Sequence, residues 1–197
     1  MSEDRPTARA RLITAAAQLF QFKGYAATGL NDILKAADAP KGSLYHYFPE
    51  GKSELAAAAM RGAGAALKRS FEHCYTQTGS SADAITAYGR ELSTWLEQSQ
   101  FKKGSPVSTV ALEQTPSQSE LGQTIAEVFD DIQNALAKSL QKDGLSETRA
   151  QSIALLALSA LEGALILARA RQSVDPVLIA SDEIAGLIRS EMASGLN

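Results

Sequence analysis

The sequence predicts an all-α protein. Apolar residues recur at spacings of three and four along almost the whole 197-residue chain, and no segment shows the period-two alternation of a half-buried strand. Aromatic residues make up only 6%, while Ala, Leu, Gln and Glu, which favour helices, are frequent. A chain of this length suits one compact domain or two small ones that share a core.

Capping and breaking residues set the boundaries of three N-terminal helices. The first helix is predicted over residues 7–23, with Gly24 at the position where a glycine ends a helix. Thr28 is the expected N-cap of the second helix. A short third helix is expected over Pro40–Tyr47, because proline is tolerated in the first turn.

Six further helices are expected after residue 50, which brings the total to about nine. Their predicted ranges are 52–76, from the break at 79–81 to 98, 107–114, 119–142, from Ser146 to 172, and from Asp175–Pro176 to 193. The break at 115–117 separates the third and fourth of these helices. We therefore expect two domains, residues 1–50 and residues 51–197.

Composition and charge restrict the function classes. The net charge of −3 opposes coating of nucleic acid by bulk charge but leaves room for a local contact patch. A single cysteine, Cys74, excludes an intrachain disulfide and a cysteine-based zinc site, and we expect no cofactor or metal. The N-terminus lacks a signal-peptide pattern, and the apolar stretch 153–168 is short and polar for a membrane span. These features favour a cytoplasmic protein without a membrane partner.

Residues 28–48 carry the clearest functional pattern, two short helices joined by a tight turn. This is the layout of a helix-turn-helix, whose second helix enters a major groove. Leu44 and Phe48 lie one turn apart and are expected to face inward, which leaves a polar face for DNA. The candidate DNA-contacting residues are Thr28, Lys41, Gly42, Ser43, Tyr45, His46 and Lys52. Such side chains suit phosphates, guanine edges and thymine methyl groups, and glycine permits close backbone approach.

This segment and the helix before it contain a recurring set of residues: Phe20, Gly24, Tyr25, Thr28, Ile33, Ala37, Lys41, Gly42, Leu44, Tyr45, His46, Tyr47 and Phe48. In spacing and residue type this set resembles the N-terminal pattern of the TetR family of bacterial transcriptional repressors. The stretch APKGSLYHYFPEGK, with KKGSPV and Glu113 further on, is similar to the multidrug-type subgroup related to the lincomycin-resistance regulator.

The chain departs from the family pattern at the turn. Asp38 replaces the usual turn glycine, and aspartate tolerates the left-handed conformation better than most residues. Pro40 replaces the usual capping serine and removes one phosphate-facing hydroxyl. The link to Lys52 is one residue longer than usual, which weakens the case for that lysine.

The resemblance implies a dimer and a small-molecule inducer. The last two helices would form a four-helix dimer bundle, and the two-fold dimer would bind a palindromic operator as a ligand-released repressor. The predicted helix over residues 146–172 is apolar on nearly all sides, which agrees with its burial in such a dimer bundle. Candidates for the ligand pocket are Phe71, Trp95, Leu96, Phe101, Val107, Val110, Leu112, Phe129 and Leu161, with the polar residues Glu113 and Glu162. Each apolar candidate also suits a plain core position, and the expected ligand is apolar or aromatic.

Two other function classes stay open at this stage. A small helical enzyme is disfavoured, because the chain shows no nucleophile–base–orienter pattern, no metal-ligand pair and no glycine-rich phosphate loop. A helical adaptor without DNA binding is disfavoured by the intact segment Lys41–Phe48. Activation in place of repression, and a thiol switch at Cys74, are further alternatives.

Overall fold

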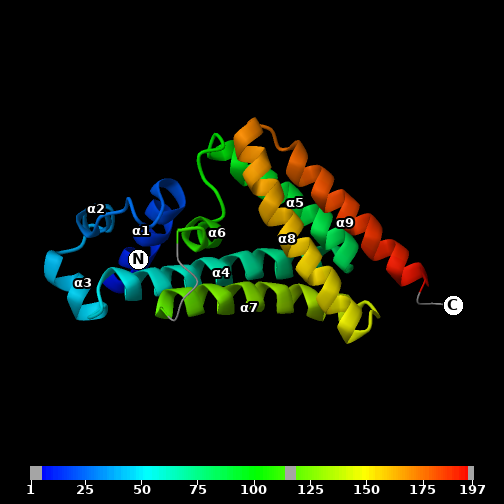
Figure 1. Ribbon diagram of the computed structural model, residues 1–197, viewed down its shortest axis with the longest axis horizontal. Coiled ribbons are helices and arrows are strands. Elements are labelled where there is room, and N and C mark those ends of the chain that lie inside the picture. The colour runs from blue at the N-terminus through cyan, green and yellow to red at the C-terminus, as the bar shows by residue number, and fades with distance from the viewer. Residues whose placement is uncertain (1–5, 114–118, 195–197) are drawn as a thin grey trace, which may run out of the picture. The chain divides into compact units, whose positions relative to one another are not determined.

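The computed structural model describes residues 6–113 and 119–194, and in this part of the chain all regular structure is helical (Figure 1). The helices are α1 (Ala8–Lys23), α2 (Leu30–Ala36), α3 (Lys41–Tyr47), α4 (Lys52–Thr78), α5 (Ser81–Gln98), α6 (Pro106–Ala111), α7 (Glu120–Lys142), α8 (Glu147–Arg171) and α9 (Asp175–Ser194). The predicted all-α class is confirmed, and so is the number of helices within the described residues.

Hydroxyl side chains begin three of the helices. The Thr7 hydroxyl accepts a hydrogen bond from the amide of Ala10 (3.2 Å) at the start of α1. Ser80 and Ser146 cap α5 and α8 in the same way. Each cap satisfies an amide that has no partner inside its helix, so these starts are visible in the local sequence.

Other helix ends differ from the prediction. Thr28 is not the N-cap of α2; Gly29 takes that place, and the Thr28 hydroxyl donates to the carbonyl of Gly24 (2.6 Å). Pro40 is the N-cap of α3 and has an extended backbone, so it lies just before the first turn. Asp175 lies within the first turn of α9 and is not its cap. Helix α4 continues to Thr78 and α6 ends at Ala111, while the predicted break at 115–117 lies outside the described residues.

The described residues group into two compact units. The first contains residues up to 64 together with 106–128, and the second contains 65–105 and the residues from 129 onward. The expected boundary at residue 50 is therefore not where the packing divides, because the start of α4, helix α6 and the start of α7 belong with the first unit. Arg61 of α4 donates to the Thr124 hydroxyl of α7 (2.9 Å), which is one of the contacts that hold them there.

The first unit has a core formed by α1, α2 and α3. Its largest fully buried side chains include Leu12, Phe20, Ile33, Leu44 and Phe48. Helix α6 packs on α1 and buries Val107 and Val110. The apolar faces predicted from helical spacing are thus the faces that meet in the core.

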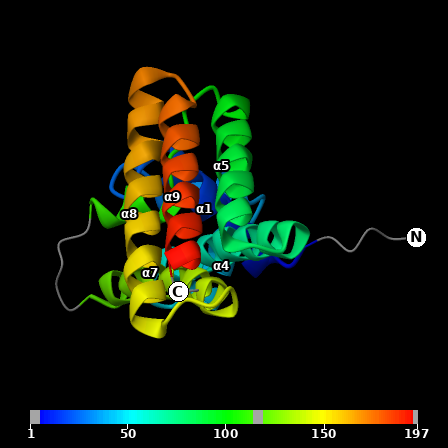
Figure 2. The ribbon, with the colours of Figure 1, turned by 90° about the vertical axis from the view of Figure 1, so that its right-hand side faces the viewer.

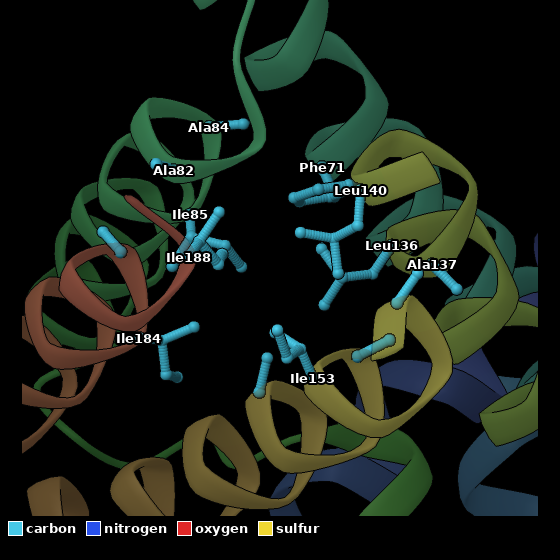
Figure 3. Close-up of a cluster of buried hydrophobic side chains, with 14 of the residues drawn as sticks. Phe71, Ala82, Ala84, Ile85, Leu136, Ala137, Leu140, Ile153, Ile184 and Ile188 are labelled. Carbon is cyan, nitrogen blue, oxygen red and sulfur yellow. The ribbon is translucent and has the colours of Figure 1, made fainter. Parts of the chain in front are cut away.

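The second unit is built around α5, α8 and α9, which lie side by side (Figure 2). Side chains from α4, α5, α7, α8 and α9 meet in its main cluster (Figure 3). Among the labelled members are Phe71, Ile85, Leu140, Ile153 and Ile188. Burial of several such side chains, at about 1.5–3 kcal/mol each, supplies most of the stabilisation of the unit.

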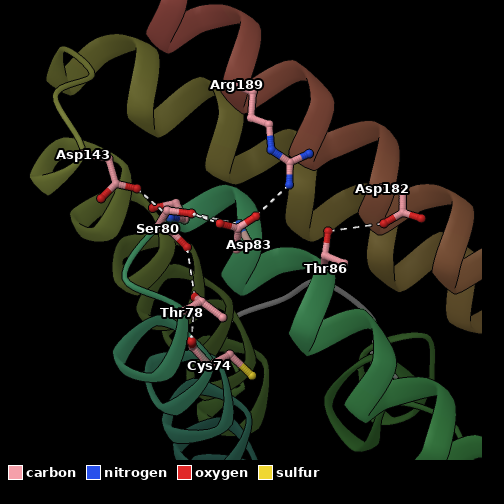
Figure 4. Close-up of polar contacts among 9 residues, drawn as sticks. Cys74, Thr78, Ser80, Asp83, Thr86, Asp143, Asp182 and Arg189 are labelled. Carbon is pink, nitrogen blue, oxygen red and sulfur yellow. Dashed lines mark hydrogen bonds and ion pairs between the residues drawn. The ribbon is translucent and has the colours of Figure 1, made fainter.

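Polar contacts join the ends of these helices (Figure 4). Arg189 of α9 donates to the Asp83 carboxylate of α5 (2.8 Å), and Thr86 donates to Asp182 (3.3 Å). Asp143, just after α7, accepts from the amide of Ser81 (2.6 Å). The two exposed contacts, Arg189–Asp83 and Thr86–Asp182, add little to stability.

Helix α8 is long and apolar enough to cross a membrane by length and composition, with a mean hydropathy of 1.9 over its most apolar window. Core helices of soluble proteins pass the same test. Ile153, Ala157 and Leu161 of α8 pack inside the second unit. Helix α8 is therefore a core helix of the second unit, and one of its sides is exposed.

Candidate nucleic-acid interface

The turn between α2 and α3 is held by Arg11 of α1. Its guanidinium donates to the carbonyls of Ala37 and Asp38 (2.9 Å each). Asp38 has φ 47°, so the left-handed turn expected at this departure from the family pattern is confirmed. Arg11 was not among the predicted site residues, since its partners lie 26 and 27 residues further along the chain.

Helix α3 is divided into a buried and an exposed side. Leu44 and the following Phe48 are buried, as predicted. The opposite side exposes Lys41, Gly42, Tyr45 and His46, with Ser43 half-buried. Tyr45 is 61% exposed, and a Cβ atom at Gly42 would meet nothing within 4 Å. The five predicted contact residues on α3 therefore lie on the accessible part of this helix, and their contacts with DNA stay predictions.

An open groove lies beside this surface. Its lining residues come from α2, the turn and the start of α3: Asn31, Leu34, Lys35, Asp38, Ala39, Pro40 and Lys41.

The other two predicted DNA contacts have partners within the protein. Thr28 is only 1% exposed, and its hydroxyl is bonded to Gly24. The Lys52 ammonium lies 4.3 Å from the centre of the Tyr25 ring. Burial lowers the pKa of Lys52, and the negative charge of Glu113 opposes this shift. Their contacts with phosphate stay predictions, and the buried Thr28 side chain is the weaker candidate.

The predicted ligand-pocket residues are divided between the two units. Val107, Val110 and Glu113 belong to the first unit, and Leu112 in the same segment is exposed. In the second unit, Trp95, Leu96 and Phe101 join one apolar cluster, Phe71 and Leu161 join another, and Phe129 is half-buried. The structure thus supports a core position for the apolar members of this set other than the exposed Leu112, and a role in ligand binding stays a prediction.

A polar group lies among the apolar residues of the second unit. Ser105, in the segment before α6, donates to the Glu162 carboxylate of α8 (3.1 Å). Burial, with a smaller contribution from Glu162, raises the pKa of Tyr88. Tyr88 of α5 was not predicted, although it lies one turn before Leu92 and shares its apolar side. Helical spacing alone would have indicated this residue.

The thiol of Cys74 is buried in the core of the second unit. Burial raises its pKa to about 12, and Glu91 adds to the shift. A protonated, buried thiol is a poor nucleophile, which argues against the thiol switch considered above.

Comparison with known proteins agrees with this geometry. A profile described as "Bacterial regulatory proteins, tetR family" matches residues 12–59, and one described as "Transcriptional regulator LmrA/YxaF-like, C-terminal domain" matches residues 81–183. The HTH-type transcriptional regulator YxaF of Bacillus subtilis is 31% identical over 95% of this chain and 98% of the relative. The chain belongs to the TetR family. Its members are transcriptional regulators that bind DNA through the helix-turn-helix, and they are not enzymes.

The TetR-family assignment extends to the LmrA/YxaF-like subgroup. The regulator LmrA of Bacillus subtilis is 31% identical over 92% of this chain and 96% of the relative. Among solved structures, a TetR regulatory protein from Rhodobacter sphaeroides superposes with a TM-score of 0.79 at 21% identity, covering 90% of this chain and 97% of that one. At this identity the superposition supports the TetR fold alone.

Proposed function

We propose that the chain is a cytoplasmic repressor that binds a palindromic operator as a homodimer and is released by a small apolar or aromatic inducer. The observation that supports the proposal best is the exposed polar side of α3. The opposite side of this helix is buried in the core and holds the helix in place. A helix fixed in this way presents a rigid surface to a major groove.

An uncovered apolar surface supports the homodimer. Four half-exposed side chains lie on one side of α8: Leu155, Leu156, Ile166 and Leu167. Between them lies Gly163, where an added Cβ atom would meet nothing within 4 Å. On α9, Ile179 is 62% exposed. Apolar surface on two adjacent helices favours a second copy as its cover, and two-fold symmetry then matches an operator palindrome.

The second unit supports the inducer class. Its partly buried aromatic side chains Trp95 and Phe101 adjoin a cluster of α5 and α8 residues. The Ser105–Glu162 hydrogen bond adds one polar group that can orient a ligand. We infer an inducer with an apolar or aromatic body and a polar group that hydrogen-bonds to this pair.

The proposal is tested by fluorescence anisotropy with the DNA that lies upstream of the protein's own gene. We expect selective binding over a scrambled duplex, with log affinity falling linearly as log salt rises. A panel of aromatic compounds is then screened for release of the duplex. Equal binding to both duplexes would contradict operator recognition at this site.

A further inference from the structure

The Glu113 carboxylate lies against the turn between α1 and α2. Its Oε2 accepts a hydrogen bond from the backbone amide of Ala26 (2.6 Å), and both residues are exposed. The same carboxylate lies over Gly24, where an added Cβ atom would overlap Oε1 and the flexible Glu113 side chain would have to shift. This contact joins residues 87 positions apart in the sequence.

A lysine lies beside the same turn. The Lys52 ammonium is 4.3 Å from the ring centre of Tyr25, the residue that precedes Ala26. Against the larger lowering by burial, the negative charge of Glu113 raises the pKa of Lys52. A backbone amide with an adjacent ammonium is a donor set that proteins use to bind DNA phosphates.

We propose that the Ala26 amide and the Lys52 ammonium form a binding site for an operator phosphate, and that the Glu113 carboxylate occupies this site in the DNA-free protein. The carboxylate is then an internal competitor of DNA. Because it neutralises one cation and would face the phosphate chain, it lowers affinity for any duplex. This inference rests on the proposed DNA-binding function.

The competitor also gives α6 a direct effect on DNA binding. Glu113 follows closely after the end of α6 at Ala111, so a displacement of α6 moves the carboxylate toward or away from the turn. Stronger engagement of Glu113 weakens DNA binding, and withdrawal strengthens it. A signal that reaches α6 can therefore change affinity without any change in the recognition surface on α3.

The substitution Glu113→Gln tests the competition. The side-chain oxygen of the glutamine still accepts the hydrogen bond from the Ala26 backbone amide, but the glutamine carries no negative charge. We expect binding of both the operator and a scrambled duplex to tighten about 3- to 10-fold, and the salt slope to steepen by about one per subunit. Glu127→Gln is the matched control, because Glu127 is an exposed carboxylate of the same unit paired with Arg61 (3.8 Å). It should leave DNA affinity unchanged.

The same substitution made in a Lys52→Gln variant distinguishes competition with DNA from a purely structural role of the Glu113–Ala26 contact. Lys52→Gln should weaken DNA binding, and adding Glu113→Gln to it should give a smaller gain than in the wild-type background, because only the repulsion between the carboxylate and the phosphates remains to be relieved. Thermal melts confirm that each variant is folded. Weaker binding by Glu113→Gln, or an undiminished gain beside Lys52→Gln, would overturn the proposal. A wild-type protein that binds no duplex selectively would instead contradict the proposed function.

Discussion

At the scale of single residues, α3 separates stability from recognition. Leu44 has no exposed surface, whereas its neighbour Tyr45 is 61% exposed. Truncating a buried leucine costs about 2–5 kcal/mol, while exposed substitutions stay within about 0.5 kcal/mol. Substitution of Leu44 should therefore lower stability, whereas substitution of Tyr45 should lower DNA affinity.

We predict that Tyr45→Ala weakens operator binding about 10-fold or more, since a lost base or phosphate contact is worth about 1–3 kcal/mol. Anisotropy titrations measure the affinity, and thermal melting shows that the fold is retained. Leu44→Ala serves as the contrast and should lower the melting temperature. Unchanged affinity of Tyr45→Ala would remove this side chain from the interface.

Cys74 should behave as an inert core residue. Its pKa is raised from an ordinary value of 9.0 to about 12, so almost no thiolate is present at neutral pH. We predict alkylation at pH 8 about 100-fold slower in the native protein than in urea, followed by mass spectrometry. The folded state also keeps its thiol proton at higher pH than the unfolded chain, so this group lowers stability as pH rises from 9.0 toward about 12. Rapid native alkylation, or loss of DNA binding in Cys74→Ala, would favour the thiol switch.

At the scale of elements, local patterns located the helices but not all of their ends. Ser80 and Ser146 act within three residues of their own position, so their caps are readable from sequence. Thr28 had the right residue type for a cap, but its hydroxyl donates to the carbonyl of Gly24, and Gly29 holds the N-cap position. No local pattern distinguishes these outcomes, because the residue type is the same and the position of the helix start decides which one occurs.

In the candidate site, too, the sequence predicted some residues and missed others. The exposed side of α3 follows from helical periodicity once Leu44 and Phe48 are assigned inward. Arg11 and Glu113 could not be placed in this way, since their partners at Ala37 and Ala26 are distant in sequence. Long-range partners of charged side chains depend on how helices pack, and a single sequence does not contain that information.

Two glycines of α4 provide a matched test of helix packing. A Cβ atom at Gly64 would lie 2.3 Å from Val128 of α7, whereas one at Gly62 would lie 3.7 Å from Ile13, an ordinary contact. Both alanine variants gain about 1 kcal/mol of helix propensity. We predict that Gly64→Ala is destabilising by about 1–3 kcal/mol because of overpacking, while Gly62→Ala is neutral or stabilising. Urea unfolding at one protein concentration measures both, and equal effects would show that the close approach of α4 and α7 is not required.

At the scale of the whole molecule, a net charge of −3 must be reconciled with DNA binding. The recognition surface is small, so its local charge matters more than the total. In the proposed homodimer, two copies of the chain would place two such surfaces on one duplex, and the second contact would then occur at high effective concentration. We therefore expect dimer formation to be as important for operator affinity as the residues of α3.

The apolar side of α8 gives the last prediction. Stable dimers bury about 1,200–2,000 Å² in total, an area that two long helices per subunit can supply. We predict that Leu156→Arg with Leu167→Arg yields a monomer of 20.9 kDa in sedimentation, because four arginines cannot be buried without partners. Selective operator binding should fall at least about 100-fold with the loss of bivalent contact.

Leu112→Arg is the control for this experiment, because Leu112 is 79% exposed but lies in the first unit, away from α8 and α9 in the chain. It should leave the mass unchanged. A double variant that stays dimeric would place the interface elsewhere on the protein. A wild-type chain that sediments as a monomer would require each α3 helix to bind DNA alone, and the salt slope of the wild type should then match that of the double variant.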